Sequence, residues 1–219
     1  ILPETNKTLD RSATRVSQML RNFATMLSDR SYAGYVLTII GNFSGLFAYL
    51  LGASFVLVDQ LGMTPTAFGL SFGFASVGFM SGAFLGSRVV RFMGIEKMCL
   101  MGTFCSAAGG LLVFGLIWSD VISIWSIILP TVMYFFGMGM SQPNIQAGAI
   151  SPYPQMAGAA ASLLGLAQYV SAGLLSMVLA IFAFDQTFLL ATIMGTSGLF
   201  ALVAFLLMIW LPMKRHAAT

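Results

Sequence analysis

The chain has 219 residues, of which 58% are hydrophobic and only 8% are charged, and its mean hydropathy is +0.90. Soluble domains carry about 25% charged residues, so this composition excludes a soluble globular domain and indicates a membrane protein. Ten Lys and Arg against seven Asp and Glu give a net charge of +3. We interpret this excess as the basic bias of membrane-protein loops and not as a surface for nucleic acid.

Residues 1–32 are the extended polar region of the sequence. Apolar residues recur there at helical spacing, and arginines occupy other faces. The apolar set is Leu9, Val16, Leu20, Phe23 and Leu27, and the basic set is Arg11, Arg15 and Arg21. This pattern predicts an amphipathic helix along the cytoplasmic membrane interface, which we interpret as a linker helix packed on the ends of the spans. Because the chain begins with Ile1 and shows no signal peptide, we expect it either to start within a longer protein or to have been trimmed.

Six apolar stretches follow the linker. They cover residues 35–57, 66–87, 98–118, 121–142, 159–183 and 187–211. A helix needs about 20 apolar residues to cross the hydrocarbon core, so each stretch predicts one transmembrane span. The sequence thus divides into a cytoplasmic linker at 1–32, a six-span unit at 33–213 and a cytoplasmic tail at 214–219.

The basic residues alternate with the spans. The connections at 58–65, 119–120 and 184–186 contain no Lys or Arg, and each holds one acid: Asp59, Asp120 and Asp185. All ten basic residues lie in the remaining segments: Lys7, Arg11, Arg15, Arg21, Arg30, Arg88, Arg91, Lys97, Lys214 and Arg215. Basic residues near span ends stay on the cytoplasmic side, so both termini are predicted to be inside.

The second and fifth stretches begin alike. Residues 65–69 read Pro-Thr-Ala-Phe-Gly and residues 154–158 read Pro-Gln-Met-Ala-Gly. By the charge pattern, the second span enters from outside and the fifth from inside. Each is the middle helix of a group of three, so the sequence favours two inverted three-helix repeats, a recurring plan among transporters.

Small residues form a stripe on each of these two middle spans. Gly78, Gly82 and Gly86 repeat every four residues on the second span. On the fifth span Ser162, Gly165, Tyr169, Gly173 and Ser176 share one face. Small residues let helices approach closely in lipid, so both stripes predict helix contacts.

No Asp, Glu, Lys, Arg or His lies well inside a predicted span. A buried charge costs about 2.5–3.5 kcal/mol on insertion scales and marks proton or ion paths. An intramembrane aspartyl protease needs two buried acids, and a rhomboid-type serine protease needs a buried histidine, whereas the histidine here is His216 in the tail. The sequence also lacks metal-ligand spacing. It therefore predicts neither an enzyme nor a metal or cofactor site.

The polar residues inside the spans are neutral, and many are aromatic. Tyr35, Thr38, Asn42 and Tyr49 share one face of the first span at helical periodicity. On the fourth span, amides lie beside Pro143, where we expect the helix to break and line a cavity. Each of these residues alone is explained by an interhelical hydrogen bond. Together they suit a pocket for a mostly apolar small molecule, and the candidate lining residues are Asn42, Tyr49, Tyr134, Gln142, Asn144, Gln168 and Tyr169.

Three segments resemble one family. Leu2-Pro3-Glu4-Thr5, ahead of the basic linker, looks like the segment after the sixth span of the bicyclomycin-resistance and chloramphenicol-efflux (Bcr/CflA) transporters. Residues 139–144 (Gly-Met-Ser-Gln-Pro-Asn) are similar to that family's tenth span, and residues 154–165 to the entry of its eleventh. These proteins are drug:proton antiporters of the major facilitator superfamily. The resemblance implies that the six spans are the C-terminal half, spans seven to twelve of twelve.

One loop departs from the superfamily pattern. The cytoplasmic motif has the form Gly-x-x-x-Asp-Arg-x-Gly-Arg-Lys, and its acid helps to latch the inward gate. Residues 86–94 read Gly-Ser-Arg-Val-Val-Arg-Phe-Met-Gly, so a valine stands where the acid would be. The resemblance also implies that the proton-coupling acid lies in the first half of the full transporter, which fits the lack of buried charge here.

We therefore expect an all-α protein of the bacterial inner membrane, half of a major facilitator fold. The resemblance implies efflux of a small amphipathic or apolar substrate by alternating access, with protons carried through the missing N-terminal half. We expect lipid around the chain, no cofactor and no nucleic acid. Two alternatives remain open: a six-span half-transporter that works as a homodimer, and a membrane scaffold module that transports nothing.

Overall fold

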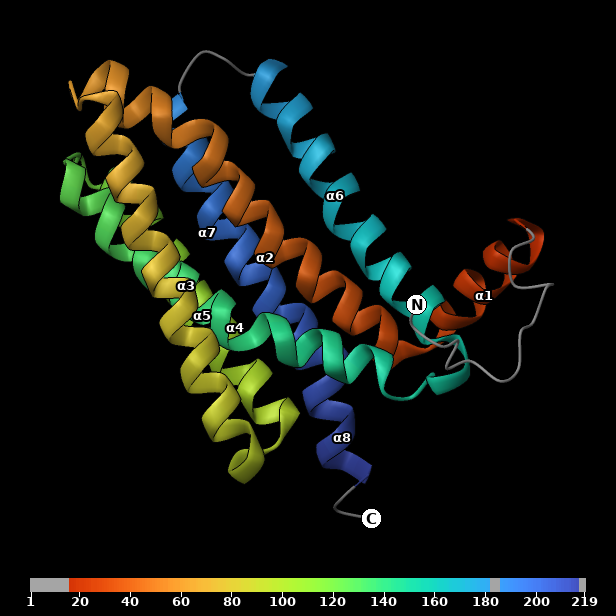
Figure 1. The fold of residues 1–219 in the computed structure, drawn as a ribbon. Coiled ribbons are helices and arrows are strands. Elements are labelled where there is room, and N and C mark those ends of the chain that lie inside the picture. Colours follow the sequence, from red (N-terminus) through yellow and green to blue (C-terminus); the bar gives the residue numbers. More distant parts are fainter. Residues whose placement is uncertain (1–15, 182–185, 217–219) are drawn as a thin grey trace, which may run out of the picture.

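The structure, a computed structural model, describes residues 16–181 and 186–216 (Figure 1). Several residues used in the sequence argument lie outside these ranges: Leu2, Pro3, Glu4, Thr5, Lys7, Leu9, Arg11, Arg15 and Asp185.

The described residues form helices joined by short connections. In chain order these are α1 (Val16–Ser28), α2 (Arg30–Ser54), η1 (Phe55–Gln60), α3 (Pro65–Met93), α4 (Ile95–Trp118), α5 (Ile124–Ile150), η2 (Pro154–Met156), α6 (Ala157–Ile181), α7 (Gln186–Phe205), η3 (Leu206–Trp210) and α8 (Leu211–His216). Within the described ranges, six helices are long and apolar enough to cross a membrane. The prediction of an all-α, six-span membrane protein is confirmed.

Local side chains determine where the spans begin. Asp29 accepts a hydrogen bond from the Ser31 backbone N–H, so α2 begins at Arg30 and not at residue 35. Thr64 caps α3 in the same way and is followed by Pro65, whose fixed φ suits the first helical turn. Ser123 and Ser126 form a reciprocal capping box at the start of α5. These caps satisfy N–H groups that the first turn of a helix leaves unpaired.

The expected helix break at Pro143 is wrong. α5 continues from Ile124 to Ile150 through both Pro130 and Pro143, whereas the sequence predicted a span of 121–142. Pro143 has no N–H to donate to the Gly139 carbonyl one turn earlier. Asn144 Nδ2 donates to the next carbonyl, that of Met140, 2.7 Å away. Packing against neighbouring helices keeps α5 helical across Pro143, as it does at prolines in other membrane helices.

The linker helix packs on one end of the bundle. Met26 of α1 is fully buried, and Phe23 packs against the same cluster, which includes Tyr32 and Ile209. Leu20 and Leu27, predicted to share the apolar face, are exposed. At this end Arg30 Nη2 also donates to the Leu207 carbonyl, 2.8 Å away, so the start of the first span lies beside the end of the sixth.

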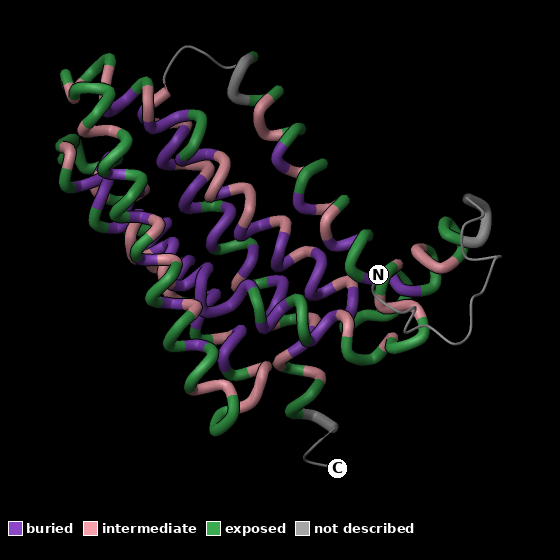
Figure 2. The backbone as a smooth tube through the Cα atoms, viewed as in Figure 1, coloured by how far each residue is buried: buried purple, intermediate pink, exposed green. Residues whose placement is uncertain are grey.

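The packing follows the exchange expected for two inverted repeats. The second and third helices of each group of three pack on the first helix of the other group: α3 and α4 on α5, and α6 and α7 on α2. The two third helices, α4 and α7, pack on each other. The most exposed spans are therefore the two middle helices, α3 and α6, which lie at the margins of the bundle (Figures 1 and 2).

The glycine stripe of α3 lies on the backbone of α5. A Cβ added at Gly82 would collide with the Phe136 carbonyl oxygen, and one at Gly86 would lie 3.2 Å from the Met140 carbonyl oxygen. The helix contact predicted for this stripe is confirmed. The corresponding prediction for α6 is wrong within the described chain, because a Cβ at Gly165 or Gly173 would meet nothing within 4 Å and Tyr169 is 70% exposed.

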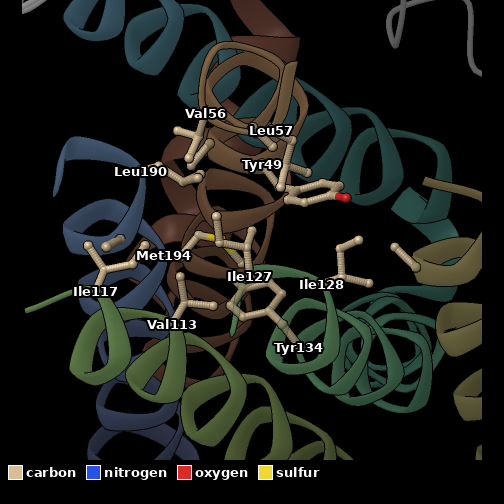
Figure 3. Close-up of a cluster of buried hydrophobic side chains, with 14 of the residues drawn as sticks. Tyr49, Val56, Leu57, Val113, Ile117, Ile127, Ile128, Tyr134, Leu190 and Met194 are labelled. Atoms are coloured by element: carbon tan, nitrogen blue, oxygen red, sulfur yellow. The ribbon is translucent and has the colours of Figure 1, made fainter. Parts of the chain in front are cut away.

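Buried side chains form one cluster toward each end of the spans. The cluster far from α1 joins residues of α2, η1, α4, α5 and α7, including Tyr49, Val113, Tyr134 and Met194 (Figure 3). The cluster near α1 includes Tyr35, Cys99, Ile145 and Phe205. Tyrosine hydroxyls thus belong to both of these otherwise apolar clusters, and a buried hydroxyl needs a hydrogen-bond partner.

Candidate ligand groove

A groove of about 280 Å³ lies between α2, α3 and α5. It is lined by Phe43, Leu46, Phe72, Ser76, Phe79, Met80, Phe135, Met138 and Gln142. None of these residues carries a charge, and four are phenylalanines. The walls are therefore suited to flat apolar rings.

Gln142 is the polar side chain of this groove that is free to bind. The other polar residue, Ser76, donates its hydroxyl proton to the Phe72 carbonyl at 2.9 Å within its own helix. Gln142 is only 7% exposed, and its Oε1 has no hydrogen-bond partner. A buried carbonyl oxygen without a partner costs about 1–3 kcal/mol. Since an amide can turn either its oxygen or its nitrogen toward the groove, Gln142 can accept from a ligand or donate to one.

A second buried amide, that of Asn42 on α2, contacts Ser141, the residue before Gln142 on α5. Asn42 Nδ2 donates to Ser141 Oγ at 3.2 Å, and Ser141 donates to the Met138 carbonyl at 3.3 Å. The serine hydroxyl has one proton, so it must accept from Asn42, and this fixes the orientation of the Asn42 amide. Asn42 Oδ1 consequently remains buried without a partner.

Tyr134 and Tyr49 lie behind the groove and tie helices together. The Tyr134 hydroxyl donates to the Asn42 carbonyl at 3.1 Å and lies 3.3 Å from the Gly41 carbonyl. The Tyr49 hydroxyl lies 3.2 Å from Ser71 Oγ, which donates to its own helix, so Tyr49 is the donor. The Tyr49 ring also packs edge-on against Phe135, with centroids 5.7 Å apart. These two tyrosines support a wall of the groove without facing it.

The remaining candidates are dispersed. Asn144 is buried and bonded to its own helix, and Gln168 is buried on α6. Tyr169 is exposed on the adjoining face of α6. Of the seven candidate residues, the structure thus brings Gln142 into the groove, puts Asn42, Tyr49 and Tyr134 behind it, and gives Asn144, Gln168 and Tyr169 no part in its walls.

Sequence reasoning missed the apolar walls. On α3 the wall residues Phe72, Ser76, Phe79 and Met80 recur at helical spacing, as do Phe135, Met138 and Gln142 on α5. Helical periodicity shows that such residues share a face. It does not distinguish a face turned to a groove from one turned to lipid, so only the polar member of the set stood out.

Comparison with known proteins identifies the relatives of this chain. No protein-family model matches it. It is 28% identical over 217 residues to multidrug resistance protein D of Escherichia coli K12, and 25% identical over 205 residues to a bicyclomycin resistance protein homolog of Haemophilus influenzae. An uncharacterized MFS-type transporter of Bacillus subtilis, YdgK, is 29% identical over 170 residues. The chain is homologous to drug-resistance transporters of the major facilitator superfamily.

The matches extend over nearly the whole chain but over only part of each relative. The first two cover 98% and 94% of this chain, against 52% and 51% of the relatives. The chain therefore spans about half the length of the curated relatives it matches. The predicted resemblance to drug-resistance transporters of this superfamily is confirmed.

Proposed function

We propose that this chain is the C-terminal half of a proton-coupled drug exporter of the bacterial inner membrane. The observation that carries the proposal is the uncharged, phenylalanine-lined groove with one unpaired amide at Gln142. The relatives, named for multidrug and bicyclomycin resistance, support export of small molecules. Their greater length supports a second half, which would supply the proton-coupling acid.

The groove favours a particular kind of substrate. Its aromatic and methionine walls take an apolar ring system, and the Gln142 amide takes one neutral hydrogen-bonding group on that ring system. A permanently charged group at this position would lose its hydration without a compensating partner. The substrate moiety bound by this half is therefore aromatic or alicyclic, uncharged, and carries an amide or hydroxyl.

The orientation in the membrane follows from the charges. In the structure, the basic residues whose positions are described lie at the α1 end of the bundle: Arg21, Arg30, Arg88, Arg91, Lys97, Lys214 and Arg215. Asp59 and Asp120 lie toward the opposite end. Basic loops are retained in the cytoplasm, so the α1 end is the cytoplasmic end, with residues 1–32 as the linker, 33–213 as the six-span unit and 214–219 as the tail.

The exposed stripe of α6 gives the second half a place to pack. Gly165 and Gly173 have open space, and Tyr169 lies between them on the helix. Small residues are typical of close contacts between membrane helices. Tyr169 would then lie at the boundary of the two halves, where alternating access opens and closes a central path.

Alanine substitution at Gln142 tests the proposed site. In cells that depend on the full-length gene product, we expect Gln142→Ala to lower resistance to uncharged aromatic antibiotics while protein abundance in the membrane is unchanged. Asn144→Ala tests the neighbouring amide in the same assay. Gln146→Ala is the matched control, because Gln146 lies on the same helix and is exposed. Unchanged resistance in the Gln142 variant would rule out this site assignment.

A further inference from the structure

The groove has a polar end and an aromatic end. Gln142 lies at the polar end, beside the hydrogen bond from Asn42 of α2 to Ser141 of α5. Phe72 and Phe135 lie at the aromatic end, with their ring centroids 6.4 Å apart and their planes at 90°. Phe135 precedes Gln142 by seven residues on α5, which corresponds to about 10 Å along a helix axis. A ligand that fills the groove with its amide on Gln142 therefore has its rings between Phe72 and Phe135.

A hydrogen bond between α2 and α3 lies behind the aromatic end. The Tyr49 hydroxyl of α2 donates to Ser71 Oγ of α3, 3.2 Å away, and Ser71 donates to the Phe68 carbonyl of its own helix at 2.7 Å. Ser71 directly precedes Phe72, and the Tyr49 ring packs edge-on against Phe135 with centroids 5.7 Å apart. We call Tyr49 and Ser71 the bridge. It is joined to Phe72 through the backbone and to Phe135 through the Tyr49 ring.

The bridge is enclosed by the described helices. Tyr49 is fully buried, and Ser71 and Phe135 are only 2% and 3% exposed. Figure 3 shows the Tyr49 ring among the apolar side chains of the cluster that it shares with Val56 and Tyr134. Because the contacts of the bridge lie between α2, α3 and α5, they do not depend on what packs on the outer faces of the bundle.

The first turns of α3 contact α2 and its later turns contact α5. From Gly78 to Gly86 the α3 backbone lies on α5, and a Cβ at Gly82 would collide with the Phe136 carbonyl oxygen. Seven residues before Gly78, about 10 Å along the helix axis, the bridge joins Ser71 to α2. The bridge therefore fixes the distance between α2 and the first turns of α3, at the end of the groove where aromatic rings line it.

We propose that Tyr49 is a positioning residue that sets, through the bridge, the size of the ring system that the groove accepts. This inference rests on the proposed function and adds a selectivity to it. The bridge holds Phe72 and Phe135 at a fixed spacing, and a packed interior adapts poorly to added volume. Without the Tyr49 hydroxyl the spacing relaxes. Wider ring systems then enter, and narrower ones lose dispersion contacts with one wall.

Binding of three amides to the full-length gene product in detergent tests the proposal. Benzamide, naphthamide and anthracenecarboxamide present the same uncharged amide on one, two and three fused rings. Equilibrium dialysis gives their dissociation constants for the wild type, Tyr49→Phe, Ser71→Ala and the double variant. Tyr32→Phe is the matched control, because Tyr32 is also a buried tyrosine of α2 and its hydroxyl donates to the Ala160 carbonyl of α6, away from the groove.

We expect each bridge variant to raise the ratio of the benzamide to the anthracenecarboxamide dissociation constant by about fivefold, the effect of one neutral hydrogen bond. The double variant should give the same shift as either single variant, because all three lack the same hydrogen bond. Tyr32→Phe should leave the ratio unchanged. Gln142→Ala should weaken all three amides by a similar factor, since they share the amide group.

The ratio separates a change of groove width from a general loss of stability, which would weaken all three amides alike. Tyr49→Phe keeps the ring and leaves no buried hydroxyl unpaired, so the result does not depend on how well Ser71→Ala folds. If the wild type binds the amides and Tyr49→Phe leaves the ratio unchanged, or Tyr32→Phe shifts it equally, this inference is overturned and the proposed function stands. Failure of the wild type to bind any of the three amides would contradict both.

Discussion

At the scale of single residues, buried hydrogen bonds distinguish supports from binding groups. Tyr134 and Gln142 both looked like pocket residues in the sequence, because both are polar residues on an apolar span. In the structure the Tyr134 hydroxyl donates to the Asn42 carbonyl of α2, while the side-chain oxygen of Gln142 has no hydrogen-bond partner. The sequence shows that such residues are buried. It does not show which of them find partners, because partners come from other helices.

Removing the Tyr134 hydroxyl should loosen the α2–α5 contact. Tyr134→Phe leaves the ring in place but removes the hydroxyl that donates from α5 to the Gly41 and Asn42 carbonyls of α2. We expect a loss of about 1 kcal/mol in stability, read as a lower midpoint of thermal unfolding in detergent, with ligand affinity changed less than by Gln142→Ala. A variant as stable as the wild type would show that the hydroxyl contributes nothing.

The Tyr153 hydroxyl, between α5 and α6, donates a hydrogen bond to Asp29 Oδ2, 2.6 Å away. The contribution of this hydrogen bond to stability should be insensitive to pH across the physiological range. The Asp29 pKa is lowered from 3.8, so its stabilising contribution is present above that value and lost as the pH falls further. The Tyr153 pKa is raised from 10 to about 12, so its contribution is present below 10 and lost as the pH rises through about 12. The Tyr32 ring packs edge-on against Tyr153, with centroids 5.6 Å apart. The difference in unfolding midpoint between wild type and Tyr153→Phe should therefore be constant from about pH 5 to 9. A difference that changes within this window would contradict the assignment.

At the scale of the helices, apolar runs and glycine spacing predicted most of what is observed. The six spans and the α3 stripe follow from apolar runs and glycine spacing alone. The predicted break at Pro143 was wrong because α5 continues as one helix through the proline and stays closely packed on α3 at Gly139. The contact predicted for the α6 stripe is not found within the described chain, because a face of small residues indicates a helix contact without identifying the partner helix.

Two glycines of α3 should respond in opposite ways to alanine. At Gly82 a methyl group would collide with the Phe136 carbonyl, so Gly82→Ala should cost about 1–3 kcal/mol by forcing α3 from α5. At Gly69 nothing lies within 4 Å, so Gly69→Ala should be neutral or stabilising by up to about 1 kcal/mol through helix propensity. Thermal unfolding of the two variants checks both signs. Equal effects would mean that the α3–α5 contact is not tight.

At the scale of the whole molecule, the described chain combines an uncharged groove with charges at its ends. The groove residues carry no charge, and the basic residues within the described ranges gather at one end of the bundle. Composition and charge alternation were enough to predict this arrangement. The groove could not be predicted, since it arises where three helices that are distant in the sequence approach one another.

The predicted orientation can be checked with single cysteines. In a cysteine-free background, a cysteine at Ser119 should react with a membrane-impermeant maleimide in intact cells, because this connection lies opposite the basic end. A cysteine at Ser151, in the connection between α5 and α6, should react only after the membrane is opened. The reverse pattern would invert the proposed topology.

Transport by the purified, full-length gene product tests the central claim most directly. In proteoliposomes with an imposed pH gradient, wild type and Gln146→Ala should move an uncharged aromatic antibiotic against its gradient. Gln142→Ala should do so about tenfold more slowly, the equivalent of one lost hydrogen bond of about 1.4 kcal/mol. Transport by Gln142→Ala at the wild-type rate, or no gradient-driven transport by the wild type, would contradict the account.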